Sequence, residues 1–504
     1  MNDYARISPI ERPIAAQRQA AKRHYGVHPY FTRRPFNVIR DYILCYSREG
    51  DVVLDPFGGS GVTAIEAYLE NRVAIHNDIN PLANFIAQGI IKLSEGKLGI
   101  YREALSQLRQ VCQPLIADIE QRDAAALEGV MQALAMPENI CLPSDSDVER
   151  YYDLFTPRQL GSLAVLKTEI DKITDEHSRN GMLLAWSATL AKLNRTFLSA
   201  KGRAASRGGS SIFSIYRYKV AKEPVELPAW ETFEERVANI IAAKREIDNA
   251  IKLKQALGEW RGSFDARSLD VEELSTQLKG QVDYIFTDPP YGGHISYLDL
   301  STLWTHWLGI PPSQSARENE IIVGGELRHT EEKYIDRLHK SILACLRMLK
   351  KGRWLSVVFQ HWNVAYFEAI LSAAAESGAE LRAAVPQVGD PIWSMHKKKN
   401  RESVLAGEMI LTFCKTGTRR LNMSKNGFEL EAAVQSILSE SEANVIYGEY
   451  LFNRVVIDAW NKGAISSLTI TKNDFAKLIE DMGWHYDSQH HYWIKGQSSQ
   501  PSLF

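Results

Sequence analysis

The sequence DYIFTDPPYGG, residues 283–293, joins an apolar run to a corner built from an acid, two prolines and a tyrosine. The first half of the stretch is β-rich and apolar, which is typical of a buried strand. Because proline fixes its own φ and restricts the residue before it, the Asp288-Pro289-Pro290 corner is nearly rigid. We therefore predict a buried strand that ends in a stiff turn carrying a carboxylate and the ring of Tyr291.

A second strand-to-turn junction lies upstream, in LDPFGGSG at residues 54–61. It follows a short β-rich run at 51–55 and precedes a helical pattern that begins at Val62. A further strand closes on Asp78, and another helix is expected from about Pro81. Strand, glycine turn, helix and strand form the opening of a doubly wound α/β sheet.

The strand pattern is interrupted after about residue 96, where the sequence turns helical and polar and has no repeated period. Strand patterns return in the WRGSFDARSLD and VDYIFTDPPY stretches. Helices are expected at 296–308 and 332–350, followed by the strand RWLSVVFQ and a closing strand pair near 380–387 and 408–414. The tail ends in WHYDSQHHYWI, which is typical of two strands around a turn. We therefore predict three parts: a sheet domain at 1–95 and 256–415, a helical insertion at 96–255, and a small C-terminal α+β domain at 416–504.

Composition limits the class of protein. With 504 residues, of which 45% are hydrophobic and 24% charged, the chain is long enough to bury a sizeable core. A net charge of -2 means that a polyanion has to be met by a local basic face. Five widely spaced cysteines without a CxxC pair favour neither a disulfide framework nor a zinc site, and fit a reducing cytoplasm. We expect a soluble intracellular protein, since the start is not a secretory signal and no apolar run reaches a membrane span of about 18 to 20 residues.

The glycine turn has the chemistry of a ligand site. Its glycines let the backbone pass close to a ligand, and the following helix offers unpaired N–H groups. Asp78, at the end of the second strand, is placed to accept from both hydroxyls of a ribose. The turn is not the GxGxxG fingerprint, and it begins with Asp55, which would repel a pyrophosphate. An acid there suits a ligand with an ammonium group and a ribose, such as adenosyl methionine. The alternative is a plain turn whose glycines relieve crowding.

The proline corner offers hydrogen-bond acceptors, because proline has no N–H. The Asp288 carboxylate and the Pro289 carbonyl can accept the two hydrogens of an exocyclic amine, and Tyr291 offers a flat face for a base. Such bonds favour a pyramidal nitrogen whose lone pair can attack a sulfonium methyl, with catalysis by positioning. The alternative is that DPPY is only a turn after a strand.

These two motifs resemble those of the S-adenosylmethionine-dependent DNA methyltransferases that modify exocyclic amines, over about residues 28–95 and 256–415. DPFGGSG resembles the cofactor motif and DPPY the catalytic motif. The resemblance implies a Rossmann-like class I methyltransferase sheet, and HPYFTRRPFNVIRDYI resembles the segment that closes over the methionine end. It implies cofactor contacts from Asp55, Phe57, Gly58, Gly59, Ser60, Gly61, Asp78 and Asp265, and a catalytic corner of Asp288, Pro289, Pro290 and Tyr291.

The order of the motifs matches family members whose target-recognition region lies between them, so the helical insertion is expected to recognise double-stranded DNA. The acid at the head of DPPY favours adenine N6 over cytosine N4, and the family makes a restriction-modification or phage-defence setting with partner proteins plausible. An RNA N-methyltransferase and a non-catalytic DNA-binding subunit stay open as alternatives. Carbon-5 cytosine methylation is disfavoured, because none of the five cysteines follows a proline.

Two basic segments are candidate nucleic-acid contacts. Residues 191–220 contain seven Lys or Arg and no acid, interleaved with Phe213, Tyr216 and Tyr218, and MHKKKNR at 395–401 is a second basic run. Each has a solvated surface loop as its alternative. The candidates are Lys201, Arg203, Arg207, Arg217, Lys219, Lys397, Lys398 and Lys399.

Two further groups are expected to be structural. Trp304 and Trp307 are interpreted as helix packing near the site. No metal is expected, because the tail histidines His485, His490 and His491 lack an accompanying cysteine or paired acid.

Overall fold

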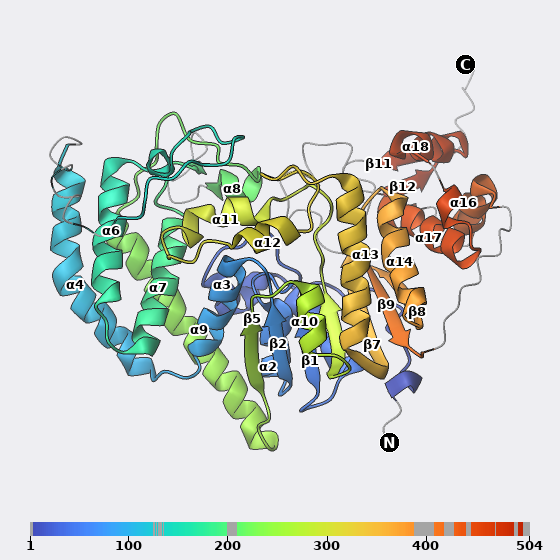
Figure 1. Cartoon of the computed structure of the whole chain (residues 1–504), viewed down its shortest axis with the longest axis horizontal. Coiled ribbons are helices and arrows are strands. Elements are labelled where there is room, and N and C mark those ends of the chain that lie inside the picture. Colours follow the sequence, from blue (N-terminus) through green and yellow to red (C-terminus); the bar gives the residue numbers. More distant parts are fainter. Residues whose placement is uncertain are drawn as a thin grey trace, which may run out of the picture.

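The computed structural model is built around one seven-stranded sheet with strand order β5-β2-β1-β6-β7-β9-β8 (Figure 1). The strands from β5 to β7 run parallel, while β9 is antiparallel to both β7 and β8. The strands are β1 (Val52–Asp55), β2 (Val73–Asn77), β5 (Ser263–Arg267), β6 (Val282–Thr287), β7 (Leu349–Phe359), β8 (Ala379–Pro386) and β9 (Met409–Lys415). The structure describes residues 4–123, 127, 129, 134, 136–198, 209–387, 408–417, 428–439, 445–468, 470–487 and 492–496. The predicted α/β fold class is confirmed.

Helices cover both faces of the sheet because its strands bury alternate residues on opposite sides. Val53 belongs to the hydrophobic core on one face, whereas its neighbour Leu54 belongs to the core on the other. The first face is covered by α1 (Phe36–Tyr46), α2 (Val62–Leu69) and α3 (Pro81–Lys92). The second is covered by α10 (Val271–Gln277), α13 (Glu331–Met348) and α14 (Val364–Glu376).

The sequence between β2 and β5 forms a helical layer beside α3 (Figure 1). Its long helices pack in the pairs α4–α6, α6–α7 and α7–α9, and α9 also contacts α2 of the sheet domain. The bounds are α4 (Leu98–Gln121), η4 (Tyr151–Leu154), α6 (Pro157–Asp171), α7 (Glu176–Leu190), β3 (Phe197–Leu198), β4 (Gly209–Ser210), α8 (Ser211–Ser214) and α9 (Ala229–Leu257).

Between β6 and β7 the chain forms α11 (Tyr297–Thr305) and α12 (Gln314–Asn319) before α13. Trp304 and Trp307 are buried here, and the indole of Trp304 donates to the carbonyl of Ser187, so the packing interpretation is confirmed. The expected helix at 332–350 ends two residues early, since β7 begins directly at Leu349.

The C-terminal part packs against α14 and β8. Its three-stranded sheet has the order β10-β12-β11, and β11 pairs antiparallel with β12, which confirms the predicted strand pair. The ring of Trp362, just before α14, lies 4.1 Å from that of Phe452. The elements are α16 (Leu430–Ser439), β10 (Val445–Tyr447), α17 (Gly448–Asn461), η7 (Ile465–Ser467), α18 (Lys472–Asp481), β11 (Trp484–Asp487) and β12 (Tyr492–Lys495).

Short helical turns precede α1: η1 (Tyr4–Arg6), η2 (Gln19–Ala21) and η3 (Arg23–Gly26). Within the described part of the chain, no helix combines the length and apolarity needed to cross a membrane. The three domain boundaries given above remain predictions.

Candidate active site

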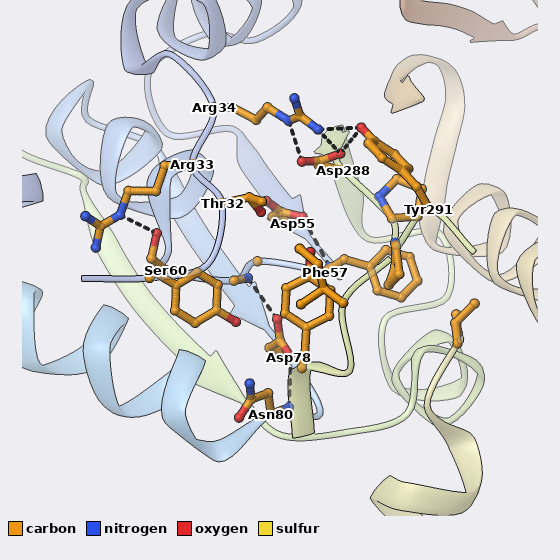
Figure 2. A pocket seen from close by; sticks show the side chains of 18 of the residues that line it. Thr32, Arg33, Arg34, Asp55, Phe57, Ser60, Asp78, Asn80, Asp288 and Tyr291 are labelled. Carbon is orange, nitrogen blue, oxygen red and sulfur yellow. Dashed lines mark hydrogen bonds and ion pairs between the residues drawn. The ribbon is translucent and has the colours of Figure 1, made fainter. Parts of the chain in front are cut away.

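Three carboxylates follow three neighbouring parallel strands. Asp55 ends β1, Asp78 follows β2 and Asp288 follows β6, and β1 lies between the other two strands. Since the carboxyl ends of parallel strands meet at one edge of the sheet, the three side chains converge on a single cavity (Figure 2).

The glycine turn passes close to its neighbours. A Cβ on Gly58 would lie 2.2 Å from the ring of His76 on β2, so this position tolerates only glycine without a shift. Gly61 caps α2 at a φ of 86°, where an L-residue is strained. The turn is fixed to β2 by a hydrogen bond from the Gly58 N–H to the Asn77 carbonyl, at 2.9 Å.

Asp55 is buried, and within the described part of the chain its carboxylate accepts from neutral donors. Its Oδ1 accepts from the Phe57 N–H at 3.2 Å and from the Thr287 hydroxyl at 2.9 Å. Burial, which disfavours the charged carboxylate, raises the pKa of Asp55 to about 7. The Asp55 carboxyl group therefore changes its ionisation state near neutral pH.

Asp78 joins the glycine turn to the start of α3. Its two oxygens accept from the N–H groups of Gly59 and Asn80, each at 2.8 Å. Burial raises its pKa to about 6. Asn80 in turn caps α3, accepting from the Leu82 N–H, with Pro81 at the first helical position.

The proline corner is fixed from behind. The Tyr334 hydroxyl donates to the Pro290 carbonyl at 2.6 Å, and the ring of Tyr291 meets that of Phe359 edge-on at 5.3 Å. The Tyr291 hydroxyl also donates to the Asp288 carboxylate. The acid and the aromatic ring of the corner therefore act as one hydrogen-bonded unit.

Asp288 is paired with a cation from the N-terminal segment. Arg34 donates through Nε to one carboxylate oxygen at 2.5 Å and through Nη2 to the other at 3.0 Å (Figure 2). The same Nη2 donates to the Tyr291 hydroxyl at 2.6 Å. On its far side, Nη1 of Arg34 pairs with Glu408, next to the first residue of β9.

The cavity brings together ten of the twelve residues predicted for cofactor binding and catalysis. They are Asp55, Phe57, Gly58, Gly59, Ser60, Asp78, Asp288, Pro289, Pro290 and Tyr291. Gly61 shapes the turn from behind, as the cap of α2. Asp265 does not line the cavity: it lies in the middle of edge strand β5, half of its side chain is exposed, and it pairs with Arg267 at 2.8 Å. Its position within the strand, rather than after it, keeps it away from the carboxyl-end edge.

Several lining residues were not named from the sequence. Tyr30, Thr32, Arg33 and Arg34 all come from the HPYFTRRPFNVIRDYI segment, whose motif indicated the segment but not its individual side chains. The remaining lining residues include Asn80, His294, Tyr297 and Glu320. Burial raises the pKa of Glu320 to about 8, and no spacing in the sequence indicates that this acid lies in the cavity.

The basic segments are only partly described. Lys201, Arg203 and Arg207 lie outside the described residues, as do Lys397, Lys398 and Lys399. Lys219 and Arg217 are exposed, and Arg217 pairs with Asp147 at 3.5 Å. Tyr218, which lies between these two cations in the sequence, is buried, and its hydroxyl donates to the backbone of α11. Among the tail histidines, His485 is exposed, and His490 and His491 lie outside the described residues.

Comparisons with known proteins give a consistent result. A family model described as DNA methylase, N6/N4 type, matches residues 10–88, which include the Arg34 segment, the glycine turn and Asp78. The chain is 20% identical to a type II methyltransferase, M.MjaII, of Methanocaldococcus jannaschii over 423 residues, which cover 70% of this chain and 75% of that protein. It is also 50% identical to an orphan methyltransferase, M.BamHII, of Bacillus amyloliquefaciens over 46 residues, 9% of this chain and 17% of that protein.

These matches fall on a sheet whose order and polarity fit a Rossmann-like methyltransferase. Together they show that the chain is similar to DNA methyltransferases of the exocyclic-amine, N6/N4 type.

Proposed function

We propose that this chain transfers a methyl group from S-adenosylmethionine to the exocyclic amine of a base flipped out of double-stranded DNA, with adenine N6 as the target. The observation that carries the proposal is that Asp55, Asp78, Asp288 and Tyr291 line the same cavity. An acceptor-rich cofactor end and an acid–aromatic corner are then adjacent, as an in-line transfer between two ligands requires.

The cofactor end fits an adenosyl amino acid. Asp55 is a buried carboxylate that a ligand ammonium would stabilise in its charged form. Each Asp78 oxygen already accepts one backbone N–H and has a further lone pair for a ribose hydroxyl. The absence of a side chain on Gly58 and Gly59 lets the backbone of the turn approach the ligand. The segment around Tyr30 and Thr32 would close over the methionine end.

The corner supplies positioning. S-adenosylmethionine, when bound, supplies a methyl carbon made electrophilic by its sulfonium, and the C–S bond breaks to leave a neutral thioether. Asp288 and the Pro289 carbonyl hold the two amine hydrogens so that the nitrogen lone pair faces that carbon. As the new N–C bond forms, the nitrogen loses one proton, for which Asp288 is the acceptor in the corner. Fixed dipoles and charges of this kind supply several kcal/mol without a covalent enzyme intermediate.

A base inside a duplex cannot reach this cavity, so the target is rotated out of the stack and seated beside Tyr291. The acid at the head of the DPPY corner favours adenine N6; cytosine N4 is the second candidate, since it presents the same amine to the same acceptors. The insertion at 96–255 is proposed to recognise the DNA sequence, with Lys219 as a contact to phosphates. Because M.MjaII carries the name of a type II methyltransferase, a restriction-modification setting is proposed as well.

The test compares Asp288→Ala with Asp336→Ala, which removes an exposed carboxylate on α13 that pairs with Lys340. Asp288→Ala should lower methyl transfer to duplex DNA by about a thousandfold or more, comparable to loss of a principal charge-stabilising group. Cofactor affinity, measured by calorimetry, should stay within a few-fold of wild type. Asp336→Ala should retain both properties. Undiminished transfer by Asp288→Ala would refute the role of the corner.

Two alternatives have their own outcomes in the same experiment. Faster transfer to structured RNA than to a synthetic duplex would make the chain an RNA N-methyltransferase. Failure to bind the cofactor at millimolar concentration would leave a non-catalytic DNA-binding subunit. Sequencing modified bases in DNA from cells that express this chain alone would report the base and its context together.

A further inference from the structure

Arg34 occupies the acceptors of the catalytic corner. Its planar guanidinium uses two N–H groups on the two oxygens of Asp288 and also donates to the Tyr291 hydroxyl. Its Cζ lies 5.5 Å from the centroid of the Tyr291 ring. Only 16% of the Arg34 side chain and 22% of the Asp288 side chain is exposed. The contact is therefore a largely buried, charge-assisted and bidentate pair.

The same positions are the ones that the target amine needs. An exocyclic amine on a ring also presents coplanar N–H donors, and its base needs the neighbourhood of Tyr291. While Arg34 holds both carboxylate oxygens and lies beside the ring, a base cannot bind there in the geometry that transfer requires. The guanidinium thus imitates the donor edge of the substrate.

Glu408 provides a second partner on the side away from the corner. It pairs with Nη1 of Arg34 while Nε and Nη2 bind Asp288. Glu408 is fixed to the end of β8, because its carbonyl accepts from the Gln387 N–H at 2.9 Å. Arg34 and Glu408 also line a second, smaller cavity on this side, with Val38, Gln387 and Ile410. If Arg34 leaves Asp288, it can therefore remain paired with Glu408, and its guanidinium can occupy the smaller cavity.

We propose that Arg34 is a stand-in for the target amine, which holds Asp288 until the base arrives and then turns to Glu408. Pro35 restricts the backbone of Arg34, so the exchange is a rotation of the side chain. This inference rests on the proposed function, since it names what competes with the flipped base for Asp288. Arg34 is a gate on base entry and takes no part in the chemical step.

This gate predicts opposite effects on the KM for target DNA when Arg34 and when Glu408 is replaced. Arg34→Met keeps the apolar stem and removes the competing donors, so the apparent KM for target DNA should fall about three- to tenfold, as expected when a competing occupied state is removed. Glu408→Gln removes the charge that receives the arginine, which should hold Arg34 more firmly on Asp288 and raise that KM. In both variants kcat should stay within about threefold of wild type.

The substrate for this test is a duplex of the context found by sequencing, with methyl transfer measured over a range of DNA concentrations. A second readout is the fluorescence of 2-aminopurine in place of the target base, which increases when the base leaves the stack. Arg34→Met should increase this fluorescence at a fixed protein concentration, and Glu408→Gln should decrease it. Arg40→Met is the control, because Arg40 is a cation on the adjoining helix that pairs with Asp41, away from the corner.

A fall in kcat of tenfold or more for Arg34→Met, with KM unchanged, would overturn the gate and make Arg34 a positioning residue for Asp288. A change of KM in the same direction in both variants would also overturn it. If Arg34→Met does not fold, as judged by thermal unfolding, the sign of the Glu408→Gln effect decides the matter. If wild-type protein transfers no methyl group to DNA, the proposed function fails first, so the two failures are distinct.

Discussion

The carboxylates in the two halves of the cavity have different kinds of hydrogen-bond partner. In the glycine half, formed by residues 55–61 and Asp78, the two acids accept hydrogen bonds from backbone N–H groups and a threonine hydroxyl. In the corner half, formed by residues 288–291, the acid is paired with Arg34. Burial raises the pKa of both acids in the glycine half, to about 7 and about 6.

This difference indicates which kind of ligand each half of the cavity can bind. An acid buried with only neutral donors is costly when ionised, and a cationic or hydroxyl-bearing ligand relieves that cost. The glycine half is therefore prepared for a ligand that brings the missing charge and donors. The corner half already contains a cation of the chain, so its ligand has to replace an internal partner. Binding to the first half is an addition, and binding to the second is an exchange.

The largest effect on the glycine half is expected from Asp78→Ala. The change removes an acceptor for the ribose and also frees the N–H groups of Gly59 and Asn80. Cofactor affinity, measured by calorimetry without DNA, should fall about 30- to 100-fold, since charge-assisted hydrogen bonds contribute about 1.5 to 3 kcal/mol each.

Asp265→Ala is the matched control for that measurement. Asp265 is also a strand acid, but it is exposed on β5 and pairs with Arg267. Its loss should leave cofactor affinity within twofold of wild type. If Asp265→Ala weakened binding as much as Asp78→Ala, the adenosine would have to extend towards β5, and the comparison between the halves would need a third region.

A smaller effect is expected from Gly61→Ala. At a φ of 86° the alanine would be strained by about 1 to 2 kcal/mol, and its Cβ would lie 2.6 Å from the Cβ of Ala87 on α3. The turn would have to move, so cofactor affinity should fall about tenfold and the melting temperature should decrease.

Gly280→Ala separates strain from displacement. Gly280 also has a positive φ, 65°, but a Cβ there would meet nothing within 4 Å, and it lies in the turn before β6. It should lower the melting temperature without changing cofactor affinity. Equal affinity in both glycine variants would mean that the close packing of the turn on α3 does not support the ligand.

Local patterns predicted the glycine half better than the corner half. The strand ends, the turn and the positions of Asp55 and Asp78 all follow from residues close together in the sequence. The partner of Asp288 does not, because Arg34 lies 254 residues before it. Glu408, the second partner of Arg34, directly precedes β9, which lies two places from β6 in the sheet. Glu320 is a similar case, since an acid in a polar loop gives no indication that tertiary packing will bury it.

For a related reason, the sequence did not show that Asp265 lies outside the cavity lining. The acid in FDARSL fits the resemblance. However, Asp265 lies only two residues before the end of β5, and the local sequence does not distinguish these two positions. Only the register of β5 against β2, in which Asp265 pairs with Ile75 and Arg267 pairs with Asn77, shows that Asp265 lies two residues before the strand end. Register on an edge strand is set by pairing, which the local sequence does not contain.

The smallest and most specific effect is expected from Asp55→Asn, which keeps an acceptor for Phe57 and Thr287 but removes the charge. In wild type the ionised fraction of Asp55 increases as pH rises through about 7, so affinity for a cationic adenosyl ligand should increase several-fold from pH 6 to pH 8. The variant should bind more weakly at pH 8 and show a much flatter profile. Asp78, with a pKa of about 6, should leave a small slope below pH 6.5.

The stability of the free protein should change in the opposite direction. The folded pKa of Asp55, about 7, lies above its ordinary value of 3.8, so between these values the folded state binds more protons than the unfolded state. The free energy of unfolding therefore falls as pH rises from about 4 to about 7, and Asp55→Asn escapes that loss. At pH 8 without ligand the variant should unfold at a higher temperature than wild type while binding the cofactor less well. A variant that is both less stable and equally well bound at pH 8 would mean that Asp55 serves the turn alone, and the two halves of the cavity would then no longer differ in how they hold charge.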